Sequence, residues 1–295
     1  MKIIVPTDIT AAMLTQTSLP ENDHPEWSAA TAYATGARVM IAATHTIYEA
    51  VKPTTGQHPA RTPDAWLRVG TTNRWAMFDD SLSTQSTANQ SITVTLRPGI
   101  LTTLTLINLR DVQTVRVTMT DPTEGVVFQQ EHDMLEKNVR NWWEYFFLPP
   151  TRRESLIIFD IPSYPLASVQ VTLEGQEEIG VGLLALGVLK EFSAGVEMGA
   201  QISIDDYSVK ERDEFGNVNL VERAFSRRAN WKFHIPNGDV DGFVRTLAAL
   251  RAKPCVYIGA NRMDTMTIYG FYRDFTVNVQ YPNHSDVSIQ IEGMT

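Results

Sequence analysis

The chain has 295 residues, of which 43% are hydrophobic, and its 34 acidic and 25 basic side chains give a formal net charge of −9. This length suits two domains or three small ones, with enough apolar content to build real cores. The acidic balance and the lack of Lys/Arg runs argue against a nucleic-acid partner, because a negative surface repels phosphate backbones.

Export and membrane insertion are not expected from the apolar segments. Residues 1–6 are too short for a secretory signal, and the longest apolar run, 181–189, is below membrane-spanning length. The sequence therefore predicts a protein made in the cytosol without a classical export signal. Cys255 is the single cysteine and lies in the apolar run 254–258. We expect it to be a buried small hydrophobe in a strand, with no disulfide and no thiolate metal site.

The first predicted unit is a small β-module over residues 1–72. Two stretches, 37–41 and 46–51, are typical of short strands, and the Pro- and Gly-containing stretch 52–59 predicts a loop. This module contains four aromatic side chains, which are candidate carbohydrate-binding residues: Trp27, Tyr33, Tyr48 and Trp66.

Flat aromatic rings on a small β-module suit a sugar, because a ring face stacks on the apolar C–H face of the sugar at low entropic cost. Each of the four rings also has a core interpretation. A module of this size needs at least two of them for its own core, so about half are expected to contact a sugar.

The second predicted unit is a jelly-roll-like β-sandwich over residues 73–192. Apolar residues alternate with polar ones around 92–96, 115–119 and 169–173, and turn signals stand at 97–99, 121–125 and 161–165. Such alternation predicts strands with one buried and one wet face. The aromatic run 141–147 is interpreted as a further strand, either of the sandwich core or as a second sugar platform or domain interface.

The third predicted unit, residues 193–295, is a β-sandwich with one helix. Alternation at 231–235, 275–281 and 287–291 predicts strands, and apolar residues at helical spacing predict a helix over 239–252 that ends at Pro254. The stretch 213–217 is typical of a hairpin tip between charged arms. Such a hairpin either meets a neighbouring subunit or is simply solvated.

Motifs for catalysis, nucleotide binding or metal binding are not found in the sequence. The six histidines are scattered, with no partner at metal-ligand spacing, so neither a metal site nor a cofactor is expected. Acidic pairs occur at 79–80, 177–178 and 205–206, but adjacent residues on a strand point to opposite faces and do not form a glycosidase dyad. Two distant carboxylates that converge in a cleft stay open as an alternative.

Two resemblances to known families follow from these residues. The spacing of Trp27, Tyr33, Gly36, Val39, Tyr48 and Trp66 resembles the small carbohydrate-binding modules of chitinases. The rest of the chain resembles tail-tip (baseplate) proteins of long-tailed bacteriophages, on the stretches 72–79, 206–217, 221–225 and 269–275. The last hundred residues look like the ring-forming domain that distal-tail and tail-tube proteins share.

The resemblance implies a non-enzymatic structural role at the virion tail tip. It implies a homo-oligomeric ring that contacts other tail proteins such as the tail tube, the tape measure and the baseplate hub, with the N-terminal module turned to a host-surface glycan. Two other hypotheses remain: a glycan-degrading enzyme or its accessory subunit, and a purely structural tail protein without glycan binding.

Overall fold

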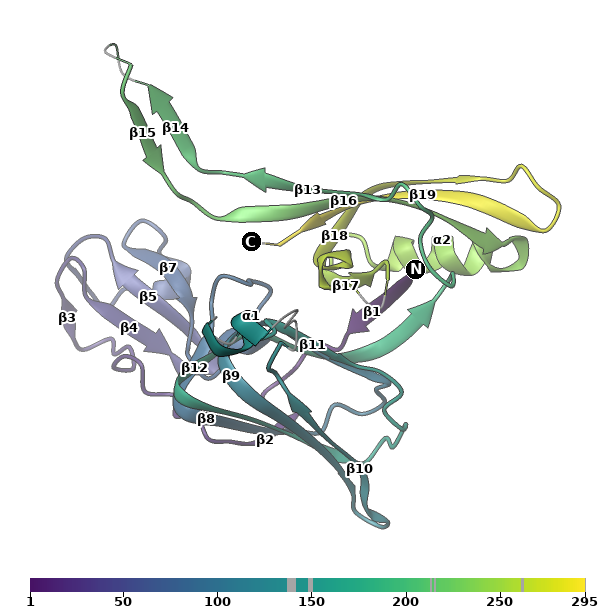
Figure 1. The fold of residues 1–295 in the computed structure, drawn as a ribbon. Helices are drawn as coiled ribbons and strands as arrows, with labels where there is room; N and C mark the ends of the chain where they lie inside the picture. Colours follow the sequence, from purple (N-terminus) through teal and green to yellow (C-terminus); the bar gives the residue numbers. More distant parts are fainter. Residues whose placement is uncertain (137–141, 148–150, 213, 215, 261–262, 295) are drawn as a thin grey trace. The chain divides into compact units, whose positions relative to one another are not determined.

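The computed structural model describes residues 1–294 except 137–141, 148–150, 213, 215 and 261–262 (Figure 1). Strands dominate the described residues, and only two α-helices occur there, so the predicted mainly-β fold is confirmed. Neither of these helices has the length and apolar character needed to cross a membrane. The chain divides into two compact units, one of Asp8–Leu186 and the other of Met1–Thr7 with Gly187–Thr295.

This division differs from the three units predicted with boundaries after residues 72 and 192. The first strand, β1 (Lys2–Pro6), pairs with the end of β12 (Ser168–Glu191) and with β17 (Cys255–Ile258). Ile3 and Ile4 are fully buried there. The chain start thus belongs to the C-terminal unit, because its hydrogen-bonding partners are supplied from residues 187–191 and 256–258.

Residues after β1 build a small module with a core of its own. β4 (Arg38–Ile41), β5 (Thr46–Ala50) and β7 (Trp66–Thr71) form a three-stranded sheet in the order β4-β5-β7. The two short strands β3 (Ala32–Tyr33) and β6 (Thr54–Thr55) pair beside it. The buried residues of this core are Val39, Ala50, Ala65 and Trp66.

The sandwich of the same unit carries the largest apolar core. β8 (Ser86–Leu96) pairs with β2 (Leu14–Thr17) and with β12. β9 (Thr103–Asp121) pairs with β10 (Gly125–Asp133) and with β11 (Ser155–Ile158). The predicted alternation is confirmed, since the following residues are all completely buried: Ile92, Val94, Leu96, Val115, Val117, Met119, Val169, Val171 and Leu173.

An irregular stretch in the middle of β9 separates the residues that pair with β11 from those that pair with β10. Residues 104–107 of β9 pair with β11, and its residues 114–121 pair with β10. Between these stretches Asn108 and Asp111 adopt positive φ angles of 55° and 56°. Asn and Asp tolerate this left-handed backbone better than other non-glycine residues, so the sequence places the irregularity where it is least costly.

The aromatic run 141–147 is not the strand that its sequence suggested. Trp142–Phe147 form the helix α1, and residue 141 lies outside the described residues. Trp142, Trp143, Phe146 and Phe147 are between 63% and 78% exposed, so the interpretation as sandwich core is wrong. At helical spacing the rings meet in pairs four residues apart, with centroids 6.2 Å and 5.7 Å apart, which a strand would not allow.

The C-terminal unit is a run of paired strands in the order β12-β1-β17-β18-β19-β16-β13. The strands not yet introduced are β13 (Gln201–Asp206), β16 (Phe225–Pro236), β18 (Thr267–Asn278) and β19 (His284–Gly293). β18 ends at Asn278, so the predicted alternation does not extend to Val279 and Tyr281, which are exposed.

The predicted helix is confirmed as α2 (Val240–Ala249). Phe243 and Leu247 are fully buried from one face of α2, and the ring of Phe243 meets those of Phe192, Phe233 and Phe275 edge to face. The helix therefore seals the core of this unit, together with the buried side chains of Trp231 and Tyr257.

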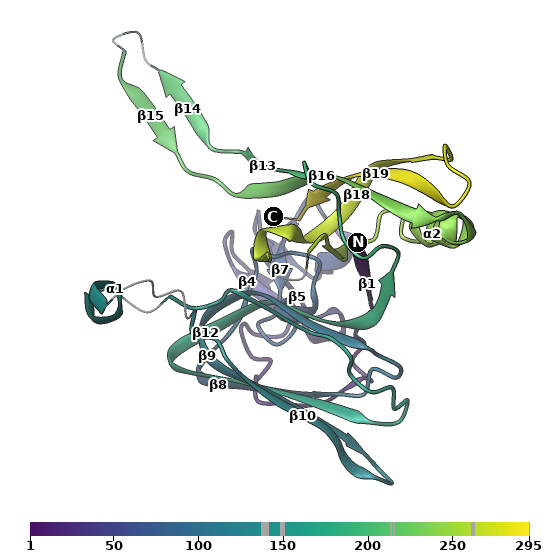
Figure 2. The ribbon, with the colours of Figure 1, turned by 45° about the vertical axis from the view of Figure 1, so that its right-hand side comes forward.

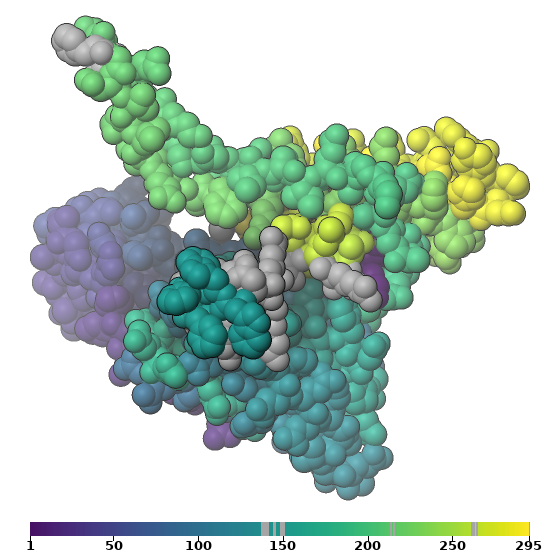
Figure 3. Space-filling model, in the orientation of Figure 1, coloured from purple at the N-terminus to yellow at the C-terminus, as the bar shows by residue number. Residues whose placement is uncertain are grey.

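A two-stranded arm extends the C-terminal unit beyond β13 and β16. β14 (Val209–Arg212) pairs with β15 (Val218–Val221), so the predicted hairpin is confirmed in its strands, while residues 213 and 215 of its tip lie outside the described residues. Figures 1 and 2 show this arm as a narrow two-stranded continuation of the β13–β16 pair. Figure 3 shows that the arm stays narrow when its side chains are drawn.

Candidate functional site

Trp66 is a core residue of the N-terminal module. Its side chain is 2% exposed, and its indole Nε1 donates a hydrogen bond of 3.0 Å to the backbone carbonyl of Gln57. The ring of Tyr33 meets it edge to face, with centroids 5.2 Å apart. A ring face that the protein already covers cannot stack on a sugar, so Trp66 is a core residue and not a sugar contact.

The other three candidates lie at the edge of that core. Trp27, Tyr33 and Tyr48 are half-buried and pack against its buried residues. Trp27 also meets the ring of His58 edge to face, at a centroid distance of 4.9 Å. Each ring is therefore held in place while part of its surface stays open to solvent, which is the arrangement that ring stacking on a ligand requires.

Tyr33 is fixed further by its hydroxyl group. The hydroxyl oxygen accepts a hydrogen bond of 2.8 Å from the backbone N–H of Ser28. Tyr48 lies on β5 directly opposite Val39 on β4 and Arg68 on β7. Arg68 is exposed and shares the face of Tyr48, so a polar, charged group stands beside the aromatic one.

A buried carboxylate ties the module to the segment that leads into the sandwich. Glu21 is only 9% exposed in its side chain. Its carboxylate lies 2.8 Å from Nδ1 of His45, accepts a hydrogen bond of 2.9 Å from the Thr72 hydroxyl, and is 3.5 Å from the Arg74 guanidinium. The imidazole of His45 stacks on the indole of Trp75, with centroids 4.1 Å apart.

The adjacent acidic pairs noted in the sequence are occupied by local interactions. Asp79 accepts hydrogen bonds from the hydroxyls of Thr71 and Thr84. Glu178 pairs with Arg110 at 3.0 Å. In the third pair, Asp205 binds Arg228 and Asp206 binds Lys210, at 2.5 Å and 2.6 Å. The Lys210 ammonium and the Ser208 hydrogen bonds hold the pKa of the Asp206 carboxyl well below its usual range.

These interactions give structural roles to four of the six carboxylates: Asp79, Glu178, Asp205 and Asp206. An acid–base dyad needs one carboxyl group whose pKa is raised, whereas the pKa of the Asp206 carboxyl is lowered. The interpretation of the chain as non-enzymatic stays a prediction.

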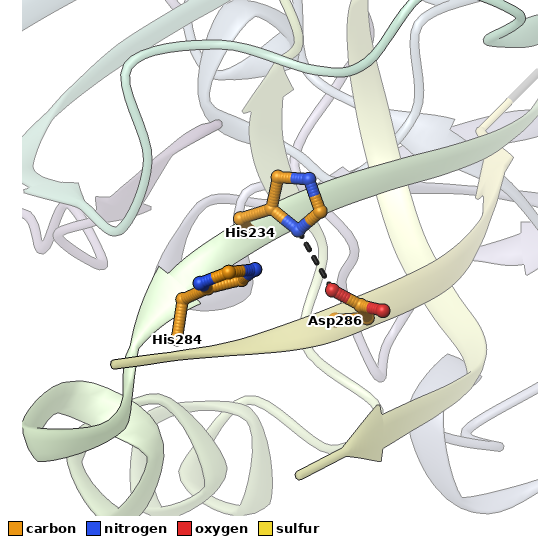
Figure 4. Close-up of side chains that lie close together, drawn as sticks. All are labelled: His234, His284 and Asp286. Atoms are coloured by element: carbon orange, nitrogen blue, oxygen red, sulfur yellow. Dashed lines mark hydrogen bonds and ion pairs between the residues drawn. The ribbon is translucent and has the colours of Figure 1, made fainter. Parts of the chain in front are cut away.

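A cluster of possible metal ligands appears where the sequence suggested none. His234 on β16 lies directly opposite Asp286 on β19, and His284 lies two residues before Asp286 on the same strand. Each offers a ligand atom, and these atoms all lie within 4.8 Å of one another. Figure 4 shows the three side chains converging on one space from the two strands.

Sequence spacing missed this cluster because its members come from two strands separated by about fifty residues. The available signal was the pair His284 and Asp286, which alternation places on one face of a strand. Only the register of β16 against β19 adds His234 to them. The exposed rings of α1 were not expected for a different reason: aromatic residues in general favour strands and buried positions.

Comparison with protein-family models, with curated proteins and with solved structures finds no match to this chain.

Proposed function

We propose that this protein is a non-enzymatic structural component of a bacteriophage tail tip, which assembles through its C-terminal unit and presents the N-terminal module to host-surface glycans. The family assignment rests on the resemblance of the stretches 72–79, 206–217, 221–225 and 269–275. In this proposal the C-terminal unit forms a homo-oligomeric ring beside other tail proteins, and the protein resides in the virion.

The observation that carries the assembly part is the surface of the arm. Leu220 on the arm is 68% exposed, and in the strands that lead into the arm Ile204 on β13 and Phe225 on β16 are 61% and 50% exposed. A two-stranded ribbon is marginal in water by itself, and apolar side chains gathered on it gain free energy when a partner covers them. A neighbouring copy in a ring is the partner that the proposal supplies.

Charges along the arm add specificity to this surface. Lys210 and Asp206 form an ion pair at the bend between β13 and β14, and Arg228 pairs with Asp205 across β13 and β16. Such exposed pairs contribute little to stability, on the order of 0 to 1 kcal/mol each, but mixed charges around apolar contacts select the correct partner and orientation.

The glycan part is supported by Trp27, Tyr33 and Tyr48, which are half-buried on a module with a core of its own. One such site binds weakly, because each aromatic contact supplies roughly 1 kcal/mol beyond its area burial. A ring of copies would raise the avidity by about 10² to 10⁴ without new contacts. This is a physical reason for a weak module to stand on an assembling protein.

Assembly is tested by the molar mass of the purified full chain, measured by light scattering across a concentration series. We expect self-association that Ile204→Lys with Leu220→Lys weakens. Val126→Lys is the matched control, since Val126 is 60% exposed on β10 of the other compact unit. A monomer at every concentration, or equal weakening by the control, would count against assembly through the arm.

Location is tested by electron microscopy of phage particles labelled with an antibody to this chain. Label gathered at the tail tip is the expected result, and unlabelled particles would overturn the virion assignment. A glycan array then separates an adhesin from a purely structural tail protein. We expect binding that Tyr48→Ala and Trp27→Ala reduce, whereas no glycan binding at all would favour the purely structural alternative.

A further inference from the structure

We propose that His234, His284 and Asp286 form a binding site for a divalent transition-metal ion of the Zn²⁺ type. The proposal is independent of the tail-tip assignment. It rests on one face of the β16–β19 pair, where two imidazoles and one carboxylate share a space within 4.8 Å (Figure 4).

The strand register explains why these three side chains meet. His234 and Asp286 are directly opposed, and His284 is the diagonal neighbour opposite Pro236. Directly opposed side chains in an antiparallel pair have Cβ atoms about 5 Å apart, and diagonal ones about 7 Å apart, within reach of an imidazole. The backbone pairing therefore holds the three ligands together without help from a loop.

The distances suit a metal ion after a small adjustment. Nδ1 of His234 and Oδ1 of Asp286 are 2.8 Å apart. Zinc binds imidazole nitrogen and carboxylate oxygen at about 2.0 to 2.2 Å in tetrahedral geometry, so two such ligands on one ion stand about 3.4 Å apart and this pair must separate by a few tenths of an ångström. A rotation of the His284 side chain closes the remaining gap, and water completes the coordination because the site is open to solvent.

The two histidine ligands are each oriented by a neighbour outside the cluster. Nε2 of His234 lies 3.0 Å from the carboxylate of Glu197, which favours the proton on that nitrogen and leaves Nδ1 for the ion. The imidazole of His284 stacks on the ring of Tyr281, with centroids 4.6 Å apart and planes 15° apart. A carboxylate behind a ligating histidine is the usual outer partner in zinc sites.

The strand ends that carry the ligands are also held together. Asn237, next after β16, donates hydrogen bonds of 2.9 Å to the backbone carbonyls of Tyr281 and Pro282. Its side-chain oxygen accepts a bond of 2.6 Å from the hydroxyl of Ser285. This network restrains the turn before His284, so little ordering remains to be done when an ion binds.

The ligand set selects the class of ion. Imidazole suits Zn²⁺, Cu²⁺ and Ni²⁺, whereas Mg²⁺ and Ca²⁺ prefer sites built from oxygen atoms alone. Without an ion, Nδ1 of His234 lies 2.8 Å from Oδ1 of Asp286, and an ion bound between the two atoms would replace that contact.

The test is calorimetric titration of the untagged full chain with ZnCl₂, after treatment with a chelator and its removal. We expect one Zn²⁺ per chain, and an affinity that falls at least tenfold in each of His234→Asn, His284→Asn and Asp286→Asn. His24→Asn is the matched control and should leave the affinity unchanged. MgCl₂ in place of ZnCl₂ should give no binding.

Glu197, the carboxylate beside Nε2 of His234, is tested by a separate variant. Glu197→Gln should weaken Zn²⁺ binding about tenfold while one ion per chain still binds, because it acts through the orientation of His234. Circular dichroism and the melting temperature in the presence of chelator show whether each variant keeps the fold of the parent chain.

A measurement on the parent chain alone guards against variants that fail to fold. Zn²⁺ should slow amide hydrogen exchange in residues 234–237 and 281–286, since the ion would join the ends of β16 and β19. The proposal is overturned by no Zn²⁺ uptake, by exchange in those segments that Zn²⁺ leaves unchanged, or by uptake that all three ligand variants retain.

Discussion

Tyr33 and Trp66 meet edge to face in the N-terminal module, with ring centroids 5.2 Å apart and an angle of 70° between the ring planes. Trp66 is buried on β7, while Tyr33 on β3 keeps part of its ring in solvent. The pair joins the three-stranded sheet to the two-stranded one. Two residues of the same aromatic pattern thus differ in role: Trp66 is part of the core, whereas Tyr33 has a ring surface open to solvent. Substitutions in the module can distinguish these roles.

Trp66→Ala should destabilise the module by about 3 to 5 kcal/mol, because it leaves a cavity in a core of only a few residues and an unpaired carbonyl at Gln57. Hydrogen exchange of residues 20–72, followed by mass spectrometry, measures the loss locally. Tyr48→Ala is the comparison, and we expect it to cost less because Tyr48 is only half-buried. Equal protection of the module in Trp66→Ala and in the parent chain would contradict the core assignment.

Glu21→Ala should loosen the attachment of the module by about 2 kcal/mol. The carboxylate is nearly buried, and its removal leaves His45, Thr72 and Arg74 without this partner. Limited proteolysis should then cut faster between residues 20 and 75. Glu131→Ala is the control, since Glu131 is 56% exposed in its ion pair with Arg116 and should change the cleavage rate little.

Period-2 alternation predicted the strands that bury one face, and its successes share a physical cause. Ile92, Val94 and Leu96 alternate because β8 has one face on a core and one in water, and the sequence records that difference directly. The helix α2 was predictable for the same reason at a period of 3.6, with Phe243 and Leu247 on its buried face.

The features that escaped the sequence depend on pairing between distant segments. β1 has no alternation that reveals its partners, and its place between β12 and β17 is set by register alone. The neighbourhood of His234 and Asp286 arises in the same way. The aromatic spacing identified four candidate sugar contacts. It could not tell which of these rings the small core would bury, and the buried one is Trp66.

A pair of glycines provides a test of the C-terminal sheet. A Cβ atom at position 270 would stand 2.0 Å from the carbonyl oxygen of Glu292 and 2.7 Å from Cα of Gly293, so Gly270→Ala must force β18 and β19 apart. We expect a loss of about 2 kcal/mol or more, in line with other overpacked sites.

Gly242→Ala is the matched variant and should act in the opposite direction. Gly242 lies inside α2, where an added Cβ atom meets nothing within 4 Å. Alanine is favoured over glycine in a helix by about 1 kcal/mol, so this change should stabilise the unit. Urea unfolding of both variants measures the two effects, and a stable Gly270→Ala chain would show that β18 and β19 are not packed as closely as described.

Stability of the C-terminal unit should fall at alkaline pH through two buried groups of β17. Burial raises the pKa of the Cys255 thiol from 9.0 to about 12, and burial likewise raises the pKa of the Tyr257 hydroxyl. In the unfolded chain the thiol ionises near pH 9, while in the folded chain it stays protonated. Above pH 9, ionisation of the thiol therefore stabilises the unfolded state but not the folded state. The stability that the protonated, buried thiol contributes is complete below pH 9 and is lost as the pH rises from 9 towards 12.

The size of this effect is about 1.4 kcal/mol for each pH unit between the two pKa values of the thiol. Urea unfolding at pH 8, 9 and 10 should show the decline, and Cys255→Ala should flatten it although it also removes some packing. The same burial predicts that Cys255 in the folded chain resists alkylation at pH 8 and reacts once urea unfolds it, since the thiolate is the reactive form. Rapid alkylation of the folded chain would mean that β17 opens far more often than its burial implies.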